Sequence, residues 1–389
     1  MNDMKPSAVV VGSGLNALGI LRCLANAKIN THLVAADDDS ATRSRFGRKY
    51  HVAETAGDAL LSALEVIGKA SGQKPVLFLT EEKSVLTVSE YRDRILPFFR
   101  ITLPAHELLV KLMRKEGFQE LAQSLGSPIP QAVHLKSEDD LIRLTQLRFP
   151  CVVKPAVKDY SYGAKFQKAY VAGSADEAAS LFRKIAPVLP DLIAQEWIEG
   201  SDSDIYFCFV YIARNSKLVA SFVGRKLRSW PPRIGGTASC VAAPQYHEQL
   251  TATTELFFRQ VGFAGMGSME FKRDTRDGCF YMVEPTVGRT DFQEEVAALN
   301  GVNIPLAAYC NETRIPLPEC NYSSVPRVWR EPTIERWAAE ALPEHSPPVY
   351  RDVVDAYWRF DDPGPWLDLF WRRIAGRAGL IRNQLMRRK

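Results

Sequence analysis

Apolar runs and amphipathic stretches alternate along the first hundred residues. Strands that alternate with helices in this way indicate a parallel, doubly wound sheet. We therefore predict an N-terminal α/β domain over residues 1–105. Its pattern predicts buried strands at residues 8–12, 31–37 and 75–80, and helices at residues 15–28 and 57–70.

After residue 105 the pattern mixes long strands with helices. Two pairs of strands are separated by the short polar turns RNSK and TRDG, which favour antiparallel hairpins. Ser174, with Glu177 three residues later, predicts the capping box of a helix. We predict an α+β domain over residues 106–318, with helices at residues 106–125, 174–189 and 247–260 and strands at residues 149–155, 168–173, 192–200, 205–213, 218–228, 267–274 and 279–285.

Residues 319–389 have little strand pattern and predict a C-terminal extension. Seven basic residues and no acidic residue lie between positions 372 and 389, beside hydrophobic residues at helical spacing. This basic amphipathic pattern is typical of helices on anionic membranes. The alternative is a helix packed on the protein with its basic side chains in solvent, and the sequence leaves both open. The spaced hydrophobic residues are Leu367, Phe370, Trp371, Ile374, Ala378, Ile381 and Leu385.

The composition excludes several classes of protein. The net charge of +4 over 389 residues is too small to predict a nucleic-acid partner. Seven scattered cysteines without a CxxC pair are typical of reduced thiols, which favours a cytoplasmic location. No apolar run reaches the length of a membrane span, so we expect at most attachment to a membrane surface. The sequence does not predict an oligomeric state.

The glycine turn GSGLNA, residues 12–17, follows the first strand and opens the first helix. This is the position of the dinucleotide fingerprint, in which phosphate binds the helix N-terminus. The fingerprint also needs an acidic residue about 20 positions later to bind the ribose. The nearest one is Asp37. The turn therefore predicts either an NAD(P) site or a tight connection that any doubly wound sheet needs.

Lys154 marks a second candidate nucleotide site. It lies near the end of the apolar strand FPCVVKP, where a lone ammonium group costs free energy unless an anion binds it. The loop that follows, residues 158–168, contains Gly163 and Lys168, and we expect it to fold over phosphate groups. The structural alternative is a lysine whose ammonium group reaches solvent at the end of the strand.

Two carboxylates on facing strands predict a metal site. Glu270 and Glu284 have apolar neighbours, in SMEF and MVEP, which is unusual for surface residues. A short hairpin can bring both carboxylates to one face. Because Mg²⁺ is often bound through one or two carboxylates and substrate phosphates, we predict Mg²⁺ here, with Mn²⁺ as a substitute.

The order and spacing of these motifs resemble the ATP-grasp superfamily, and its carboxylate–amine ligase branch, over residues 8–310. The resemblance implies an N-terminal domain that forms the acceptor-substrate site, two α+β lobes that clasp ATP, and a C-terminal helical extension. It also implies the ligands: Lys115 and Lys154 for the phosphates, Glu196, Trp197 and Ile198 for adenine, Asp204 for ribose, and Glu270 and Glu284 for the metal.

One motif departs from the family pattern. Where the family has Glu-x-Asn-Pro-Arg, this chain reads EPTVGR, so Thr286 replaces the metal-binding Asn and Arg289 is displaced by one position. We expect the Thr286 hydroxyl to bind the metal, directly or through water, and Arg289 to contact the transferring phosphate. Strand alternation predicts Lys226 and Arg228 on one face, beside the γ-phosphate and a substrate carboxylate.

These features predict an ATP-dependent ligase. It would join a small-molecule carboxylate to an amine through an acyl phosphate, and release ADP and phosphate. Two alternatives remain. One is an NAD(P)-dependent oxidoreductase that uses the glycine turn. The other is an ATP-binding module whose catalysis is altered by Thr286.

Overall fold

The computed structural model describes residues 5–36, 38–155, 169–233, 235–317, 319–372 and 374. The chain divides into two compact units, each built from segments that are distant in the sequence. Unit 1 contains residues 1–109, 207–268 and 286–389, and unit 2 contains residues 110–206 and 269–285.

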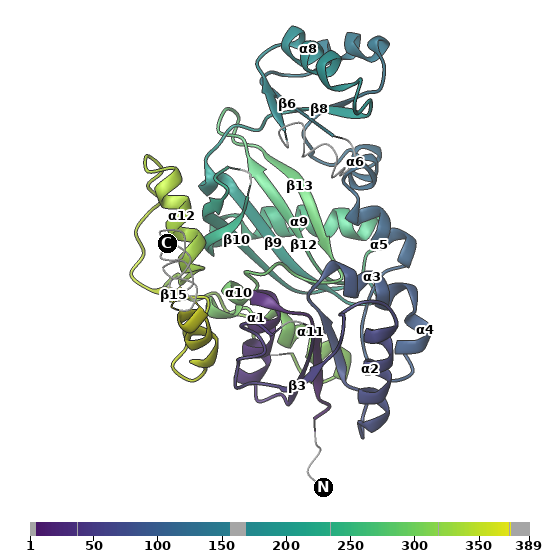
Figure 1. The fold of residues 1–389 in the computed structure, drawn as a ribbon, viewed down its shortest axis with the longest axis vertical. Helices are drawn as coiled ribbons and strands as arrows, with labels where there is room; N and C mark the ends of the chain where they lie inside the picture. Colours follow the sequence, from purple (N-terminus) through teal and green to yellow (C-terminus); the bar gives the residue numbers. More distant parts are fainter. Residues whose placement is uncertain are drawn as a thin grey trace, which may run out of the picture. The chain divides into compact units, whose positions relative to one another are not determined.

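The N-terminal part of unit 1 is a parallel sheet with the strand order β3-β2-β1-β4. Strand β3 at its edge and helix α2 are labelled in Figure 1. Strands β1 and β4 are buried at every position, as expected for strands covered on both faces, and the polar strand β3 forms an edge. This confirms the predicted α/β class. The elements are β1 (Ala8–Val11), α1 (Gly14–Asn26), β2 (Thr31–Ala35), β3 (Arg48–His51), α2 (Gly57–Ala70), β4 (Val76–Leu79), α3 (Glu82–Glu90) and α4 (Arg92–Ile95).

A second sheet has the strand order β13-β12-β9-β10-β11-β14-β15. Strand β11 pairs antiparallel with both β10 and β14, and β15 pairs parallel with β14. Three of the strands, β9, β12 and β13, contain residues of both units. The strands are β9 (Ile205–Ile212), β10 (Leu218–Trp230), β11 (Gly236–Ala242), β12 (Gly265–Arg273), β13 (Phe280–Val287), β14 (Val328–Arg330) and β15 (Val353–Asp355).

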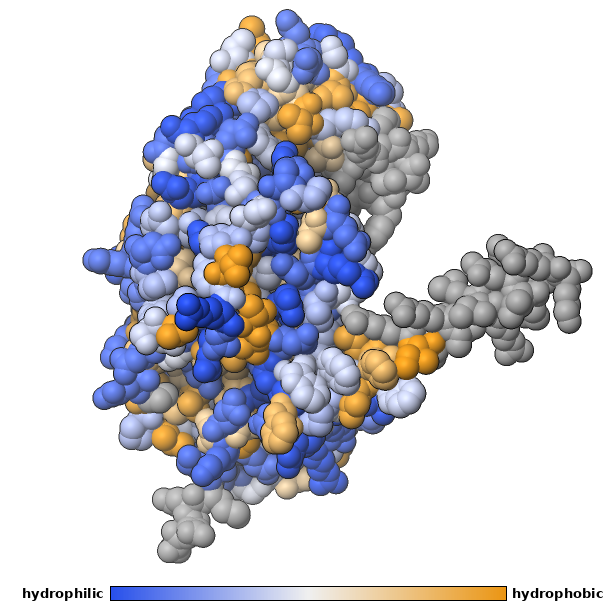
Figure 2. Space-filling view, turned by 90° about the vertical axis from the view of Figure 1, so that its left-hand side faces the viewer, coloured by the Kyte–Doolittle hydropathy of each residue, from blue (hydrophilic) through white to orange (hydrophobic). Residues whose placement is uncertain are grey.

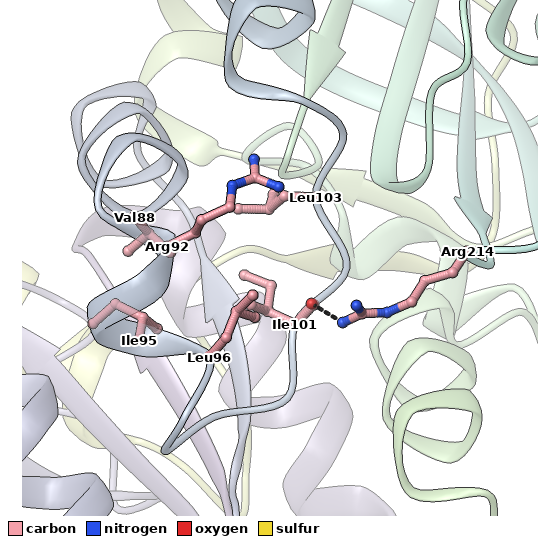
Figure 3. Close-up of a pocket in the computed structure, with 7 residues that line it drawn as sticks. All are labelled: Val88, Arg92, Ile95, Leu96, Ile101, Leu103 and Arg214. Carbon is pink, nitrogen blue, oxygen red and sulfur yellow. Dashed lines mark hydrogen bonds between the residues drawn. The ribbon is translucent and has the colours of Figure 1, made fainter.

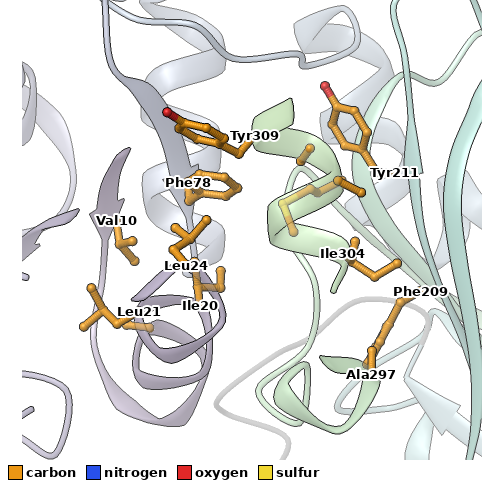
Figure 4. Close-up of a cluster of buried hydrophobic side chains, with 14 of the residues drawn as sticks. Val10, Ile20, Leu21, Leu24, Phe78, Phe209, Tyr211, Ala297, Ile304 and Tyr309 are labelled. Carbon is orange, nitrogen blue, oxygen red and sulfur yellow. The ribbon is translucent and has the colours of Figure 1, made fainter. Parts of the chain in front are cut away.

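The main hydrophobic core of unit 1 joins its two sheets (Figure 4). Side chains of β1, α1 and β4, among them Ile20 and Phe78, face side chains of α11 and β9, among them Ile304 and Phe209. Burial of these apolar side chains supplies most of the stabilisation of the unit. The helices of this part are η3 (Pro244–Tyr246), α9 (His247–Gln260), α10 (Glu295–Leu299), α11 (Ile304–Thr313) and α12 (Pro332–Ala341).

Unit 2 is built on an antiparallel sheet with the strand order β5-β8-β6-β7. Ser174 caps helix α8 by accepting a hydrogen bond from the Glu177 backbone. The Glu177 carboxylate accepts from the Gly173 N–H instead of the Ser174 N–H, so half of the predicted capping box is formed. The elements are α5 (His106–Met113), α6 (Lys115–Ser124), β5 (Ala132–Leu135), η1 (Glu138–Gln146), β6 (Cys151–Pro155), β7 (Tyr170–Ala172), α8 (Ala175–Ile185), β8 (Leu192–Glu196) and η2 (Asp202–Asp204), with α5 crossing the boundary between the units.

The structure corrects several predicted elements. The helix predicted over residues 106–125 is two helices, because Arg114 between α5 and α6 has an extended backbone conformation. Strands β3, β5, β11, β14 and β15 were not predicted. Two of them have only three residues and β3 is polar, so they depend on pairing with a neighbouring strand and carry no hydrophobic pattern of their own. Among the described residues, no helix has the length and apolar character needed to cross a bilayer.

Candidate active site

Lys154 lies on β6 of unit 2, and its ammonium group has an uncharged hydrogen-bond partner. Its Nζ donates a hydrogen bond of 2.6 Å to Oε1 of Gln195 on the neighbouring strand β8. The pKa of Lys154 is lowered to about 8, mainly by burial and further by the positive charge of Lys115, while Glu284 acts in the opposite direction. An anion bound at Nζ would therefore be stabilising.

The pKa of Lys154 links three of the predicted site residues. Lys115 begins helix α6, Lys154 lies on β6, and Glu284 lies on β13, and the charges of Lys115 and Glu284 both act on the pKa of Lys154. Two cationic groups beside a carboxylate form the charge pattern expected for a triphosphate with its metal ion. Their individual roles remain predictions.

The segment predicted to bind adenine is fixed by its backbone. The Trp197 N–H donates to the Pro150 carbonyl at 3.0 Å, and its carbonyl accepts from Arg276 Nη2 at 3.0 Å. Both polar backbone groups of Trp197 are therefore engaged within unit 2. The Glu196 N–H likewise donates to the Gln131 carbonyl, at 2.9 Å. The adenine role of Glu196, Trp197 and Ile198 stays a prediction.

Asp204, predicted to bind ribose, stabilises its own loop. Its Oδ2 accepts hydrogen bonds from the backbone N–H and the hydroxyl of Ser201, at 2.8 and 2.9 Å, in a capping box at η2. The buried Lys272 holds the same loop, because its Nζ donates to the carbonyls of Gly200 and Ser201. If Asp204 binds ribose, it does so through its other oxygen.

The predicted metal ligands lie on the neighbouring strands β12 and β13. Ser268 and Thr286 continue the rows of Glu270 and Glu284 on these strands, and both hydroxyls donate to the carboxylate of Asp291, at 2.9 and 2.7 Å. The two rows therefore reach one face of the hairpin. Within the described residues, no group of three or more His, Cys, Asp or Glu side chains forms a metal cluster. A carboxylate pair completed by phosphate oxygens still fits Mg²⁺.

Asp291 is a residue that the sequence analysis missed. It accepts the hydroxyl hydrogen of Thr286, which leaves the lone pairs of the Thr286 oxygen for a cation. Arg289 lies beside the same carboxylate, with 3.9 Å between its Nη1 and Asp291 Oδ1. The signal was an acidic residue five positions after the Thr that replaces Asn.

No protein-family model matches the chain. Over 347 residues the chain is 22% identical to D-aspartate ligase of Enterococcus faecium, and the match covers 82% of this chain and 81% of that protein. A 95-residue segment is 34% identical to D-alanine–D-alanine ligase of Pseudomonas putida, covering 24% of this chain and 28% of that protein.

Solved structures share the fold. The ADP complex of N5-carboxyaminoimidazole ribonucleotide synthetase matches with a TM-score of 0.60 at 15% identity, over 84% of this chain and 82% of that one. A second match is the biotin carboxylase domain of Hydrogenobacter thermophilus 2-oxoglutarate carboxylase, which was solved with the magnesium salt of ADP. Its TM-score is 0.60 at 13% identity, and the match covers 83% of this chain and 74% of that one. These structures have the ATP-grasp fold.

The chain therefore has the ATP-grasp fold, and the curated proteins that it is similar to are ligases. The comparisons support an ATP-dependent ligase of the ATP-grasp type.

The glycine turn of the ATP-grasp ligase is closed by carboxylates of its own chain. Asp39 accepts a hydrogen bond from the Gly14 N–H at the start of α1, the place where a dinucleotide phosphate binds. Ser13 donates to Glu81 at 2.8 Å, which adds a second negative charge. A Cβ on Gly12 would lie 2.1 Å from Thr80 Oγ1, so close packing against β4 explains this glycine. The arrangement disfavours an NAD(P) site. Asp37, the predicted ribose ligand, lies outside the described residues.

The prediction that Lys226 and Arg228 share a face of β10 is wrong. Lys226 pairs with Cys240 of β11 while Arg228 pairs with Ser239, so a β-bulge at Leu227 turns the two side chains to opposite faces. Lys226 is buried and donates to the Gly235 carbonyl at 3.2 Å. Arg228 forms an ion pair of 3.4 Å with Glu335 of α12. Arg228 therefore serves the packing of α12.

Gly163 and Lys168, with their loop, lie outside the described residues.

A cavity in unit 1 has apolar walls and two arginines (Figure 3), and it contains none of the predicted site residues. Figure 3 shows Arg214 bound to the Ile101 carbonyl at its edge. The cavity is lined by Val88, Arg92, Ile95, Leu96, Ile101, Leu103 and Arg214.

Proposed function

We propose that this ligase joins the carboxylate of one small molecule to the amine of another, through an acyl-phosphate intermediate. A carboxylate oxygen of the first substrate attacks the γ-phosphorus of ATP, and the bond between this phosphorus and the bridging oxygen breaks to release ADP. The amine nitrogen then attacks the acyl carbon. Phosphate leaves with its oxygen, and the nitrogen loses a proton as the amide forms.

In this mechanism, two lysines of unit 2 bind the phosphate groups of ATP. Lys154 and Lys115 hold phosphate oxygens and neutralise charge as the bridging bond breaks. The observation that carries the proposal is the coupling of Lys154 with Lys115 and Glu284, because it joins three predicted ligands within one unit. The preference of a buried ammonium group with an uncharged hydrogen-bond partner for an anion supports the same role.

The carboxylates supply the metal ligands. Glu270 and Glu284 would hold Mg²⁺, which withdraws charge from the phosphates when it is bound. The Thr286 hydroxyl, held by Asp291, would take the place of the family's amide oxygen. Arg289 lies next to Asp291 and would contact the transferring phosphoryl group. Lys226 retains its predicted role toward a substrate anion, because it is cationic and buried.

Amino acids are the substrate class that the relatives favour. The two curated relatives are named for the ligation of D-aspartate and of D-alanine, so one or both substrates of this chain would be an amino acid or carry one. The cytoplasmic location predicted from the scattered cysteines agrees with a supply of ATP. It remains a prediction.

The proposal is tested by ADP release with Mg²⁺ in a matrix of D- and L-amino acids and amines, D-aspartate first. Hydroxylamine added with the acid alone traps an acyl phosphate as a hydroxamate, which identifies the intermediate. We expect Glu270→Gln to reduce ADP release at least about a hundredfold, while Glu248→Gln on the exposed side of α9 keeps it. Binding of ATP without ADP release for any pair would identify an altered nucleotide-binding module instead.

A further inference from the structure

A helix near the C-terminus exposes a hydrophobic stripe to solvent. Residues 364–372 are helical, and residue 374 continues the helix. Along it, Leu367 is 43% exposed, Phe370 43%, Trp371 63% and Ile374 43%. Their spacing of three, four and seven residues puts them on one side, which in most helices of globular proteins faces the core. Here this side faces outward.

The orientation of the stripe is fixed because the polar side of the helix is bound to the body of unit 1. Asp368 pairs with Arg43 at 3.3 Å, and Arg372 donates to the Asp38 carbonyl at 2.5 Å. A Cβ on Gly364 would lie 2.2 Å from the Arg43 carbonyl oxygen, so the start of the helix is seated directly on this segment. The helix is therefore packed on the protein, and its hydrophobic side remains outside.

Aromatic rings extend the stripe. Trp366 stacks on Phe370 with 5.4 Å between ring centroids, and it meets Trp358 edge-on at 5.4 Å. Trp358 is 45% exposed and Phe360, close by in the sequence, is 93% exposed. Figure 2 shows hydrophobic residues gathered next to the point where the described chain ends. Exposed apolar clusters of this kind mark interaction surfaces.

The basic residues at the C-terminal end of the chain indicate which kind of partner this surface binds. Between positions 372 and 389 the sequence has seven Arg and Lys residues and no acidic residue. Tryptophan and phenylalanine beside basic residues form the combination that binds the interface of anionic membranes, where the rings enter the headgroup region and the basic groups meet lipid phosphates.

We propose that the surface formed by Leu367, Phe370, Trp371 and Ile374 binds an anionic lipid bilayer, without crossing it. The basic C-terminal segment adds electrostatic attraction. The proposal does not depend on the identity of either substrate.

Co-sedimentation of the full-length protein with vesicles tests the proposal. We expect binding to vesicles of phosphatidylcholine with phosphatidylserine, weaker binding at high salt, and little binding to phosphatidylcholine alone. Trp371→Ser should weaken the apparent Kd at least about tenfold, because it removes a large apolar side chain from the bilayer interface. Val349→Ser is the matched control. Val349 is 99% exposed but lies outside the stripe, and its substitution should change nothing.

A second set of variants separates charge from hydrophobicity. Replacing Arg387, Arg388 and Lys389 together with Gln should weaken binding to the anionic vesicles and reduce its salt dependence. Replacing the exposed residues Lys28, Lys184 and Lys217, equal in number, should not. Circular dichroism and ADP release confirm that each variant is folded.

Three results would overturn the proposal. One is equal binding of the wild type and Trp371→Ser to anionic vesicles. Another is a lack of vesicle binding by the wild type at low salt. The third is self-association, measured by sedimentation, that Trp371→Ser abolishes while vesicle binding is absent, which would assign the stripe to a second copy of the chain.

Discussion

At the residue scale, Lys154 shows how the fold prepares a group for an anion. A lysine on a β-strand gives no indication of its role by itself. The structure half-buries the ammonium group, gives it an amide oxygen as a polar partner, and puts Lys115 nearby. A second cation near a desolvated ammonium is unfavourable unless an anion is bound, and this argues for a phosphate ligand.

The pKa of Lys154 leads to a prediction for ATP affinity. With a pKa of about 8 in the free protein, the ammonium is charged below pH 8 and loses its proton above it. ATP affinity should therefore be constant below about pH 7 and fall by up to about tenfold per unit above pH 8. Calorimetric titration with MgATP from about pH 6 to about pH 10 measures this. Lys154→Arg should remove the fall, and a flat profile in the wild type would contradict the assignment.

Asp291 gives a second prediction at this scale, for metal affinity. Asp291→Asn removes the charge that holds the Thr286 hydroxyl, so we expect the affinity for Mn²⁺ in the presence of ADP to fall about tenfold. Electron paramagnetic resonance of bound Mn²⁺ measures it without turnover.

The variant Thr286→Asn complements the test with Asp291→Asn. It restores the residue type of the family, and it should keep Mn²⁺ affinity even when Asp291 is also replaced. Asp352→Asn, which breaks an exposed ion pair with Arg327, serves as the control. Unchanged Mn²⁺ affinity in Asp291→Asn would remove Asp291 from the metal site.

At the element scale, strand β10 shows where pattern reasoning fails. Alternation placed Lys226 and Arg228 together, but a bulge at Leu227 separates them. A bulge inserts one residue and reverses the side-chain direction beyond it, and it leaves no signature in the hydrophobic pattern. The pairing with β11, which itself was not predicted, decides which face each side chain takes.

The start of helix α10 leads to a prediction for stability. Glu294 is fully buried, accepts a bond from the Cys23 thiol at 3.6 Å, and burial raises its pKa to about 8. An unfolded Glu has a pKa near 4.5, so the stabilisation is complete below about pH 4.5 and is lost as pH rises to 8. Glu294→Gln should remove this loss and raise the free energy of unfolding at pH 8, by at most about 5 kcal/mol.

Chemical denaturation at pH 5 and at pH 8 measures the effect, with Glu248→Gln, an exposed residue on α9, as the control. The difference between wild type and Glu294→Gln should grow with pH, and the control should follow the wild type. A difference that stays constant from pH 5 to pH 8 would show that Glu294 is ionised in the folded protein.

At the scale of the whole molecule, the sequence predicted the fold class and most long elements. The apolar runs of β1 and β4 and the amphipathic pattern of α2 are local signals, so they were readable. The division into units was not readable, because unit 1 collects three segments that only tertiary packing brings together. The short strands β14 and β15 could not be predicted for the same reason, because each forms only by pairing with a neighbouring strand.

The candidate site was predicted to a similar extent. Motif order gave Lys115, Lys154 and Glu284, which the structure couples in unit 2. Thr286 replaces the Asn of the family, and its hydroxyl is held by Asp291. This role of Asp291 was found only from two hydrogen bonds, which Ser268 and Thr286 donate from separate strands. Family motifs therefore indicate the conserved chemistry of a site, and the structure indicates how this chain compensates where it differs.

The binding of MgATP by the Lys154→Gln variant tests the account most directly. Loss of a charged contact to phosphate should weaken binding about ten- to a hundredfold. Lys184→Gln, an exposed lysine on α8 of the same unit, should bind like the wild type. If Lys154→Gln binds MgATP as tightly as the wild type and keeps its fold, the nucleotide does not lie at Lys154, and the site proposed for unit 2 is wrong.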